Sequence, residues 1–179
     1  CLQEQDPDHF LQYQNAGVEA YQKGNLALAE AEFRKGLMRR RDALLLNNLA
    51  HVIMERQGNM KDALKLVDEA LLRLPGQPQM LSTRAEIYIN LGRYADALQD
   101  LQESLRKQGR TNNLLLLLAL AYEGLGDWTR AETMSKTLAG LHAQLTPAQR
   151  ERLAQLQERL DAHAAATAAK AGEYQSELT

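Results

Sequence analysis

A period of 34 residues constrains the fold of this chain more than any other feature of its sequence. Four glycines recur at this step: Gly24, Gly58, Gly92 and Gly126. Four alanines keep the same step: Ala29, Ala63, Ala97 and Ala131. A fixed period of this length is typical of repeat architectures, in which each copy is one supersecondary unit stacked on the next.

Each copy has the periodicity of two amphipathic helices separated by the glycine. In the third copy, apolar residues at helical spacing precede Gly92 (Leu81, Ala85, Tyr88) and follow it (Ala97, Leu101, Leu105). The chain contains 33 Leu and 26 Ala but only six Val and Ile together, and Leu and Ala lose little on entering a helix. We therefore predict an all-α fold of helical hairpins. We expect the glycine to end the first helix, where a positive φ is often needed.

The pattern resembles the tetratricopeptide repeat (TPR) family, whose period is 34 and whose signature has small and aromatic residues at fixed positions. The first copy matches it at Tyr13, Ala16, Gly17, Ala20, Ala29 and Phe33, whereas the fourth copy has Ser135 in place of the aromatic residue. The resemblance implies an α-solenoid of four hairpins over residues 7–145, with repeats at about 10–43, 44–77, 78–111 and 112–145. One extra residue in the second copy is expected in the turn before its second helix.

The two ends of the chain have different expected roles. Residues 1–6 are predicted to be a short tether. Thr146, Pro147 and Gln149 form a capping-box helix start, and Leu153, Leu156 and Leu160 lie on one face of the helix that follows. We predict that this helix, over residues 146–170, covers the last hairpin, and that residues 171–179 form a frayed tail.

Composition and motifs exclude several functional classes. The net charge of −2 gives no electrostatic footprint for nucleic acid. The longest apolar run, Leu114 to Ala121, is far shorter than the about 20 residues of a membrane span. No catalytic, cofactor-binding or metal-binding constellation is present in the sequence, so we predict a protein that is not an enzyme and needs no cofactor.

The resemblance implies a protein partner, an extended peptide or a helix, bound along the concave wall formed by the first helices of the hairpins. The predicted groove residues are Gln14, Val18, Tyr21, Asn47, Asn48, His51, Met54, Ser82, Glu86, Ile89, Leu116 and Leu120. We expect Asn48, His51 and Glu86 to be exposed there and free of intramolecular roles. No Lys or Arg lies among these positions, which argues against the carboxylate clamp of the family's chaperone-binding members.

The first helix of the fourth copy is apolar on all sides from Leu114 to Leu118. A helix of this kind is normally covered on every side. Two interpretations follow: the C-terminal helix shields it, or it is a hydrophobic site for a partner.

The chain begins with Cys1, its only cysteine, which excludes an internal disulfide. A chain that starts this way, with a short polar tether, looks like a bacterial lipoprotein carrying its lipid on Cys1, and Leu2 resembles an outer-membrane address. TPR lipoproteins of this kind are similar to the pilotin-like assembly factors of type IV and Tad pili and of secretion systems. We therefore expect a scaffold at the periplasmic face of the outer membrane that binds a secretin or pilus component. The alternatives are a cytoplasmic TPR chaperone for an export substrate and an adaptor for periplasmic cell-wall enzymes.

Overall fold

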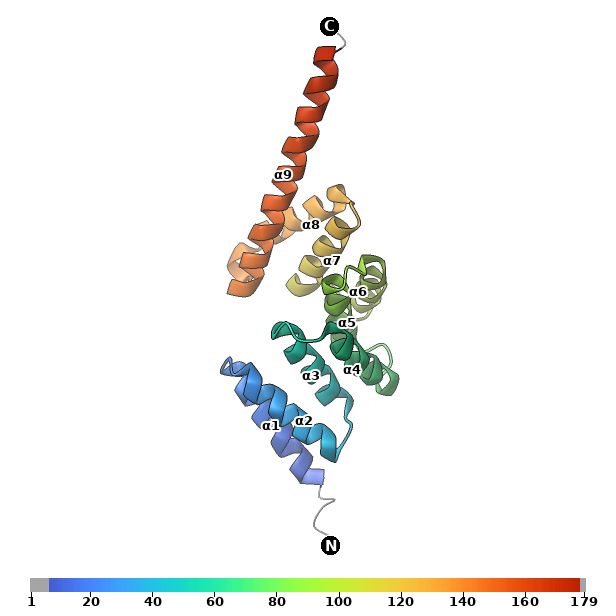
Figure 1. Ribbon diagram of the computed structural model, residues 1–179, viewed down its shortest axis with the longest axis vertical. Coiled ribbons are helices and arrows are strands. Elements are labelled where there is room, and N and C mark those ends of the chain that lie inside the picture. Colours follow the sequence, from blue (N-terminus) through green and yellow to red (C-terminus); the bar gives the residue numbers. More distant parts are fainter. Residues whose placement is uncertain (1–6, 178–179) are drawn as a thin grey trace. The chain divides into compact units, whose positions relative to one another are not determined.

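Helices account for nearly all of the described chain (Figure 1). This computed structural model describes residues 7–177, and side chains are described for residues 10–171. Within that range there are nine α-helices, one short 3-10 helix and no β-strand, which confirms the predicted all-α class. The elements are α1 (Pro7–Gln22), α2 (Leu26–Arg39), α3 (Ala43–Glu55), α4 (Met60–Arg73), α5 (Pro78–Asn90), α6 (Tyr94–Gln108), α7 (Asn112–Gly124), α8 (Trp128–Gly140), η1 (His142–Gln144) and α9 (Pro147–Glu177).

The helices belong to two compact units, residues 1–109 (unit 1) and residues 110–179 (unit 2). Unit 1 contains the hairpins α1–α2, α3–α4 and α5–α6, and successive hairpins pack through α2 against α3 and through α4 against α5. Unit 2 contains the hairpin α7–α8 and the helix α9, which contacts both α7 and α8. The four predicted hairpins therefore form, and α9 packs on the last one.

The turns inside the hairpins explain the irregular second repeat. Three of the four spaced glycines have the expected positive φ, between 71° and 76°: Gly24, Gly92 and Gly126. The expectation is wrong for Gly58, because Gln57 takes this conformation with φ of 54°. Gly58 follows as the extra residue of the turn, and its N–H donates to the carbonyl of Ile53 at 2.9 Å. The insertion therefore lies after the left-handed residue, and Ala50 is the equivalent of Gly17.

Small residues lie where the two helices of a hairpin come close. Ala29, Ala85, Ala97, Ala119 and Ala131 are all fully buried. Gly17 shows how close the approach is, because a Cβ at this position would lie 2.4 Å from Cε1 of Phe33. The first hairpin thus accommodates the large Phe33 ring only because residue 17 has no side chain.

A buried ionic network ties three helices of unit 1 together where the family pattern has an apolar residue. Arg84 on α5 donates from Nε and Nη2 to both carboxylate oxygens of Asp100 on α6, at 2.7 Å and 2.8 Å. Its Nη1 donates to Oδ1 of Asp68 on α4 at 2.9 Å. Hydrogen bonding to Asp100 raises the pKa of Arg84 above its usual value. The charge of Asp100, which is 6 % exposed, is compensated inside the fold.

The C-terminal helix begins as predicted but ends later. The N–H of Gln149 donates to Oγ1 of Thr146 at 3.2 Å, and the N–H of Thr146 donates to Oε1 of Gln149 at 3.0 Å, which is a capping box. The predicted frayed tail from residue 171 is wrong over residues 171–177, because α9 continues to Glu177. The segment before it is rich in alanine, the strongest helix former, and contains no proline. The predicted tether, residues 1–6, lies outside the described residues; α1 begins immediately after it, at Pro7.

Candidate peptide-binding surface

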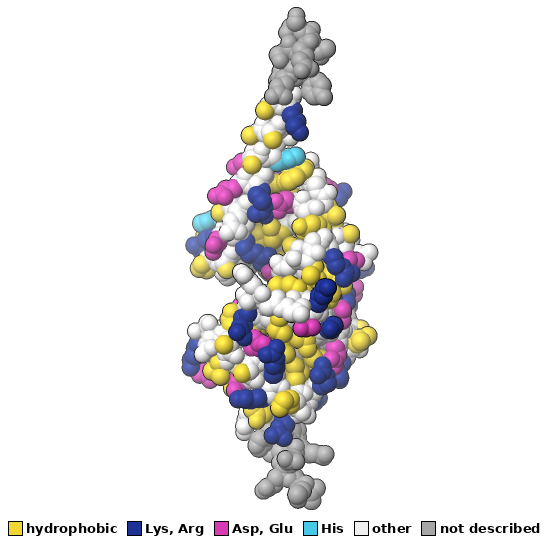
Figure 2. Space-filling view, in the orientation of Figure 1, with side chains coloured by type: hydrophobic (Ala, Val, Ile, Leu, Met, Phe, Trp, Pro, Cys, Tyr) yellow, Lys and Arg dark blue, Asp and Glu magenta, His cyan; other side chains and the backbone are white. Residues whose placement is uncertain are grey.

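The first helices of the three hairpins of unit 1 (α1, α3 and α5) together form one surface, here called the A-helix face. It consists of partly exposed side chains of α1, α3 and α5: Gln14, Val18, Tyr21, Asn48, His51, Glu55, Ser82, Glu86 and Ile89. The only side chains among them that carry a full charge at neutral pH are two glutamates. On the side of the molecule drawn in Figure 2, acidic and basic side chains are interspersed.

Tyr21, His51 and Glu55 form the centre of the A-helix face. The hydroxyl of Tyr21 donates to Oε1 of Glu55 at 2.8 Å. The rings of Tyr21 and His51 meet edge to face with centroids 5.7 Å apart, and His51 Nδ1 lies 3.6 Å from Glu55 Oε1. The cluster therefore links α1 to α3 through one carboxylate.

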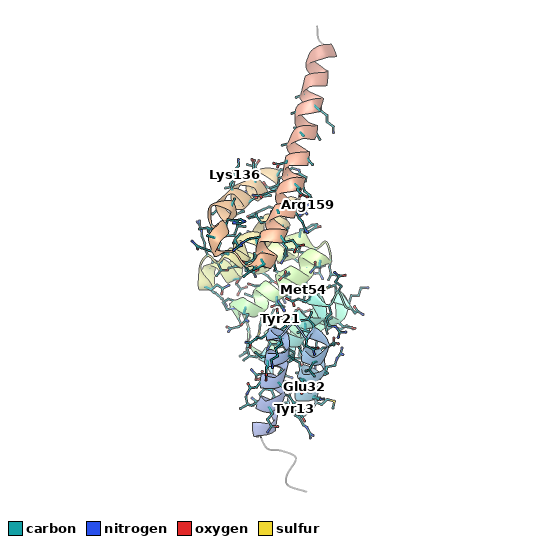
Figure 3. The ribbon with its side chains drawn as sticks, turned by 90° about the vertical axis from the view of Figure 1, so that its left-hand side faces the viewer. Tyr13, Tyr21, Glu32, Met54, Lys136 and Arg159 are labelled. Carbon is teal, nitrogen blue, oxygen red and sulfur yellow. The ribbon has the colours of Figure 1, made fainter. Side chains whose placement is uncertain are left out.

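Tyr21 also packs against the core, and its hydroxyl lies near the charge of Glu86 on α5. Its ring packs against the buried cluster that includes Met54 (Figure 3). Burial raises the pKa of the Tyr21 hydroxyl well above its ordinary value, and the hydrogen bond to Glu55 and the charges of Glu55 and Glu86 add to the effect. The hydroxyl therefore remains protonated and acts as a donor at neutral pH.

The structure removes three predicted groove residues from the surface. Asn47, Met54 and Leu116 are 3 %, 7 % and 1 % exposed. Asn47 and Met54 lie on α3, which packs against α2 on one side and α5 on the other. Their side chains are therefore covered, whereas the side chains at the same repeat positions of α1 and α5 are half-exposed. Asn47 Oδ1 is a buried oxygen without a hydrogen-bond partner in the described structure.

The remaining predicted residues are half-buried. Asn48, His51 and Glu86 are less exposed than expected. The expectation that they have no intramolecular role is wrong for two of them, because His51 contacts Tyr21 and Glu55 and Glu86 interacts with other residues of the chain. Sequence reasoning did not identify Glu55, although its spacing of four residues from His51 places both side chains on one side of α3.

Part of the apolar helix α7 is covered inside unit 2. Leu115 and Leu116 pack with Leu138 of α8, Leu145 of the following loop and Leu153 of α9. Leu120, predicted in the groove, is half-buried and packs on the same cluster. For these leucines the structure supports shielding and not an open hydrophobic site.

The described residues show no metal site and no membrane span. Among them, no three His, Cys, Asp or Glu side chains are arranged to hold a metal ion. No described helix combines the length and the apolar character that crossing a bilayer requires.

The comparisons with known proteins concern the fold. No protein-family model and no curated protein matches the sequence. A TPR protein from Parabacteroides merdae superposes with a TM-score of 0.71 and 22 % identity, over 91 % of this chain and 63 % of that protein, so this chain spans less than two thirds of its length. The TPR protein TTC0263 from Thermus thermophilus superposes with a TM-score of 0.70 and 25 % identity, over 82 % of this chain and 80 % of that one.

A third solved structure covers almost the whole of both chains. MamA from Desulfovibrio magneticus superposes with a TM-score of 0.67 and 16 % identity, over 95 % of this chain and 96 % of that one. Similarity at this level of identity concerns the backbone arrangement and not the partner. Taken with the 34-residue register and the hairpins, these structures show that the chain has the fold of the tetratricopeptide-repeat proteins.

Proposed function

We propose that this protein is a non-enzymatic scaffold that binds an extended segment of a partner protein along the A-helix face. The observation that carries the proposal is the Tyr21–His51–Glu55 cluster, which joins neighbouring repeats into one surface with Glu86 nearby. The fold supports the general role, because stacked hairpins form extended binding surfaces.

The side chains of this face suit a peptide backbone with basic residues. The amides of Gln14 and Asn48 each offer donors and acceptors, which can bond the N–H and C=O groups of an extended chain. Val18 and Ile89 provide apolar contact beside them. The face carries two carboxylates and no Lys or Arg, so electrostatic complementarity favours a partner segment that contains Lys or Arg.

Selection from a displayed library of random dodecapeptides on the full chain tests this proposal. We expect the selected peptides to be enriched in Lys and Arg and to lose about tenfold or more in affinity with Glu55→Gln, because a hydrogen bond to a charged group contributes about 1.5–3 kcal/mol. His51→Ala should weaken them as well. The matched controls are Asp62→Asn and Lys65→Ala on the exposed side of α4. Peptides that respond to the control variants and not to the A-helix variants would refute the proposed surface.

The cellular role expected from the sequence stays a hypothesis. A lipid on Cys1 would hold the protein at the periplasmic face of the outer membrane, where it would assist assembly of a pilus or secretion pore. Cys1 lies outside the described residues. Mass spectrometry of the N-terminal peptide from fractionated membranes of the native host tests this. A soluble, unmodified chain would favour the cytoplasmic chaperone, and a lipidated chain whose cross-linked partner is a cell-wall enzyme would favour the adaptor.

A further inference from the structure

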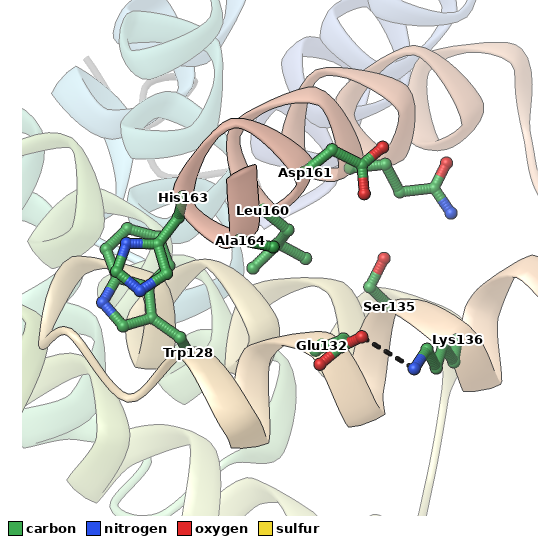
Figure 4. Close-up of a pocket in the computed structure, with 9 residues that line it drawn as sticks. Trp128, Glu132, Ser135, Lys136, Leu160, Asp161, His163 and Ala164 are labelled. Atoms are coloured by element: carbon green, nitrogen blue, oxygen red, sulfur yellow. Dashed lines mark ion pairs between the residues drawn. The ribbon is translucent and has the colours of Figure 1, made fainter. Parts of the chain in front are cut away.

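A cavity of about 260 Å³ opens between α8 and α9, entirely within unit 2 (Figure 4). Four residues of α8 and five residues of α9 line it. It is smaller than the about 300–1,000 Å³ of pockets for drug-sized ligands, so its size suits one inserted side chain.

Ser135, where the fourth repeat departs from the sequence pattern, is one of the lining residues. The position occupied by Ser135 is filled in the first three repeats by Phe33, Val67 and Leu101, all of which are buried. Phe33, for example, packs inside its own hairpin against Gly17 of α1. Ser135 lines the pocket and is only 2 % exposed, but it lacks their volume. Ser135 therefore contributes a small polar side chain to the cavity wall, where the earlier repeats have a bulkier apolar one.

Ordered apolar groups form one part of the wall. The rings of Trp128 on α8 and His163 on α9 stack with centroids 3.8 Å apart and planes 11° apart. Leu160 lies beside them and packs in a cluster with Trp128. Arg159 Nη2 donates to Glu123 Oε2 of α7 at 2.8 Å, which holds α9 in place just before His163. The contacts that form this part of the pocket wall therefore also hold α9 in place.

Charged groups form the other part of the wall, and the negative charge is in excess. Glu132 pairs with Lys136 at 2.7 Å along α8. Asp161 on α9 faces the same pocket, and it has no ion-pair or hydrogen-bond partner among the described side chains. One carboxylate is therefore left to interact with a ligand.

We propose that the α8–α9 pocket binds an arginine side chain of a protein partner. The aliphatic stem of arginine matches Leu160 and the Trp128 ring, and its guanidinium can form paired hydrogen bonds with the carboxylate of Asp161. A purely apolar side chain would remove Asp161 from water without giving it a partner, which is unfavourable. An acidic side chain would be repelled by Asp161. The site lies in unit 2, and it shares no residue with the A-helix face.

The single tryptophan of the chain makes this pocket directly observable. The fluorescence of Trp128 in the full chain is titrated with the blocked peptide acetyl-Gly-Arg-Gly-amide. Matched peptides carry citrulline, which has the shape of arginine without the charge, or leucine. We expect saturable binding of the arginine peptide and at least tenfold weaker binding of the citrulline and leucine peptides.

Two variants separate the charge of the site from its volume. Asp161→Asn should weaken arginine binding about tenfold without affecting the fold, because the side chain is exposed. Ser135→Leu places the residue of the third repeat into the cavity and should abolish the fluorescence response, with far-UV circular dichroism checking that the helices form. Glu151→Gln, an exposed change elsewhere on α9, is the control and should bind as the original chain does.

Three results would overturn the proposal. Equal affinity for the arginine and citrulline peptides would show that the positive charge of arginine does not contribute to binding. Tighter binding of the leucine peptide, unaffected by Asp161→Asn, would identify an apolar site instead. The absence of a saturable response to the arginine peptide would show that the pocket does not take this side chain.

Discussion

Replacing Gly17 with alanine tests the packing that defines the first hairpin. Alanine in a helix is more favourable than glycine by about 1 kcal/mol. A Cβ at residue 17 would, however, lie 2.4 Å and 2.5 Å from two carbons of the Phe33 ring, where about 3.5–4.0 Å is the favourable separation. Phe33 is 2 % exposed, so its ring has little space to move. Overpacking costs about 1–3 kcal/mol. We expect the steric term to dominate, with a net loss of about 1–2 kcal/mol.

Later repeats of the same chain provide the compensating change. Alanine occupies the equivalent position where the partner is smaller, as Ala85 does opposite Leu101. Phe33→Leu alone should cost about 1–2 kcal/mol, less than the about 3–5 kcal/mol of truncating phenylalanine to alanine. The double variant Gly17→Ala/Phe33→Leu should be more stable than the sum of the single changes predicts, with a coupling of about 1 kcal/mol or more.

Urea denaturation followed by circular dichroism measures these differences as shifts in midpoint at an unchanged slope. Gly140→Ala is the control, because a Cβ there meets no atom within 4 Å and only the helix-propensity gain remains. A raised midpoint for Gly17→Ala, or strict additivity in the double variant, would refute the reasoning about the Phe33 contact.

Three further changes test the core, the buried ions and the acid response. Ala97→Leu should cost about 1–3 kcal/mol in chemical denaturation, because Ala97 is fully buried between helices. Arg84→Ala should cost about 3 kcal/mol by the same assay, because it leaves Asp100 buried without its partner. The hydrogen bond from Arg41 lowers the pKa of Glu69 from 4.5 to about 2. The stability from this pair is therefore fully present above pH 4.5 and is lost as the pH falls towards 2, so thermal melting of Glu69→Gln should depend less on pH across this interval.

Matched variants at exposed positions control for these effects. Ala95→Leu lies on the exposed side of the same helix as Ala97 and should be nearly neutral. Arg93→Ala breaks the exposed pair with Asp96 and should cost at most about 1 kcal/mol. Glu132→Gln breaks an exposed pair on α8 and should leave the acid response unchanged. If Ala95→Leu or Arg93→Ala cost as much as its test variant, burial would not be the cause of the loss of stability. If Glu132→Gln changed the acid response as Glu69→Gln does, the pair of Arg41 and Glu69 would not be its cause.

The repetitive parts of the fold were determined by the local sequence. A helix is specified by its own periodicity and caps, and a hairpin by small residues where two adjacent helices touch. The 34-residue register therefore predicted the hairpins and the buried alanines, such as Ala29 and Ala97, and it also predicted an extra residue in the second turn. It did not predict that Gln57 would take the left-handed conformation ahead of Gly58, because the period alone does not say on which side of an insertion the backbone reverses.

The composition of the candidate sites was decided by tertiary structure. Asn47 is buried whereas the equivalent Gln14 and Ser82 are half-exposed, because burial depends on the neighbours that a helix has on both sides, and these come from distant parts of the chain. The α8–α9 pocket likewise needed the structure. The sequence has Ser135 in place of an apolar residue, but only the packing of α9 on α8 forms the cavity that both Ser135 and Asp161 line.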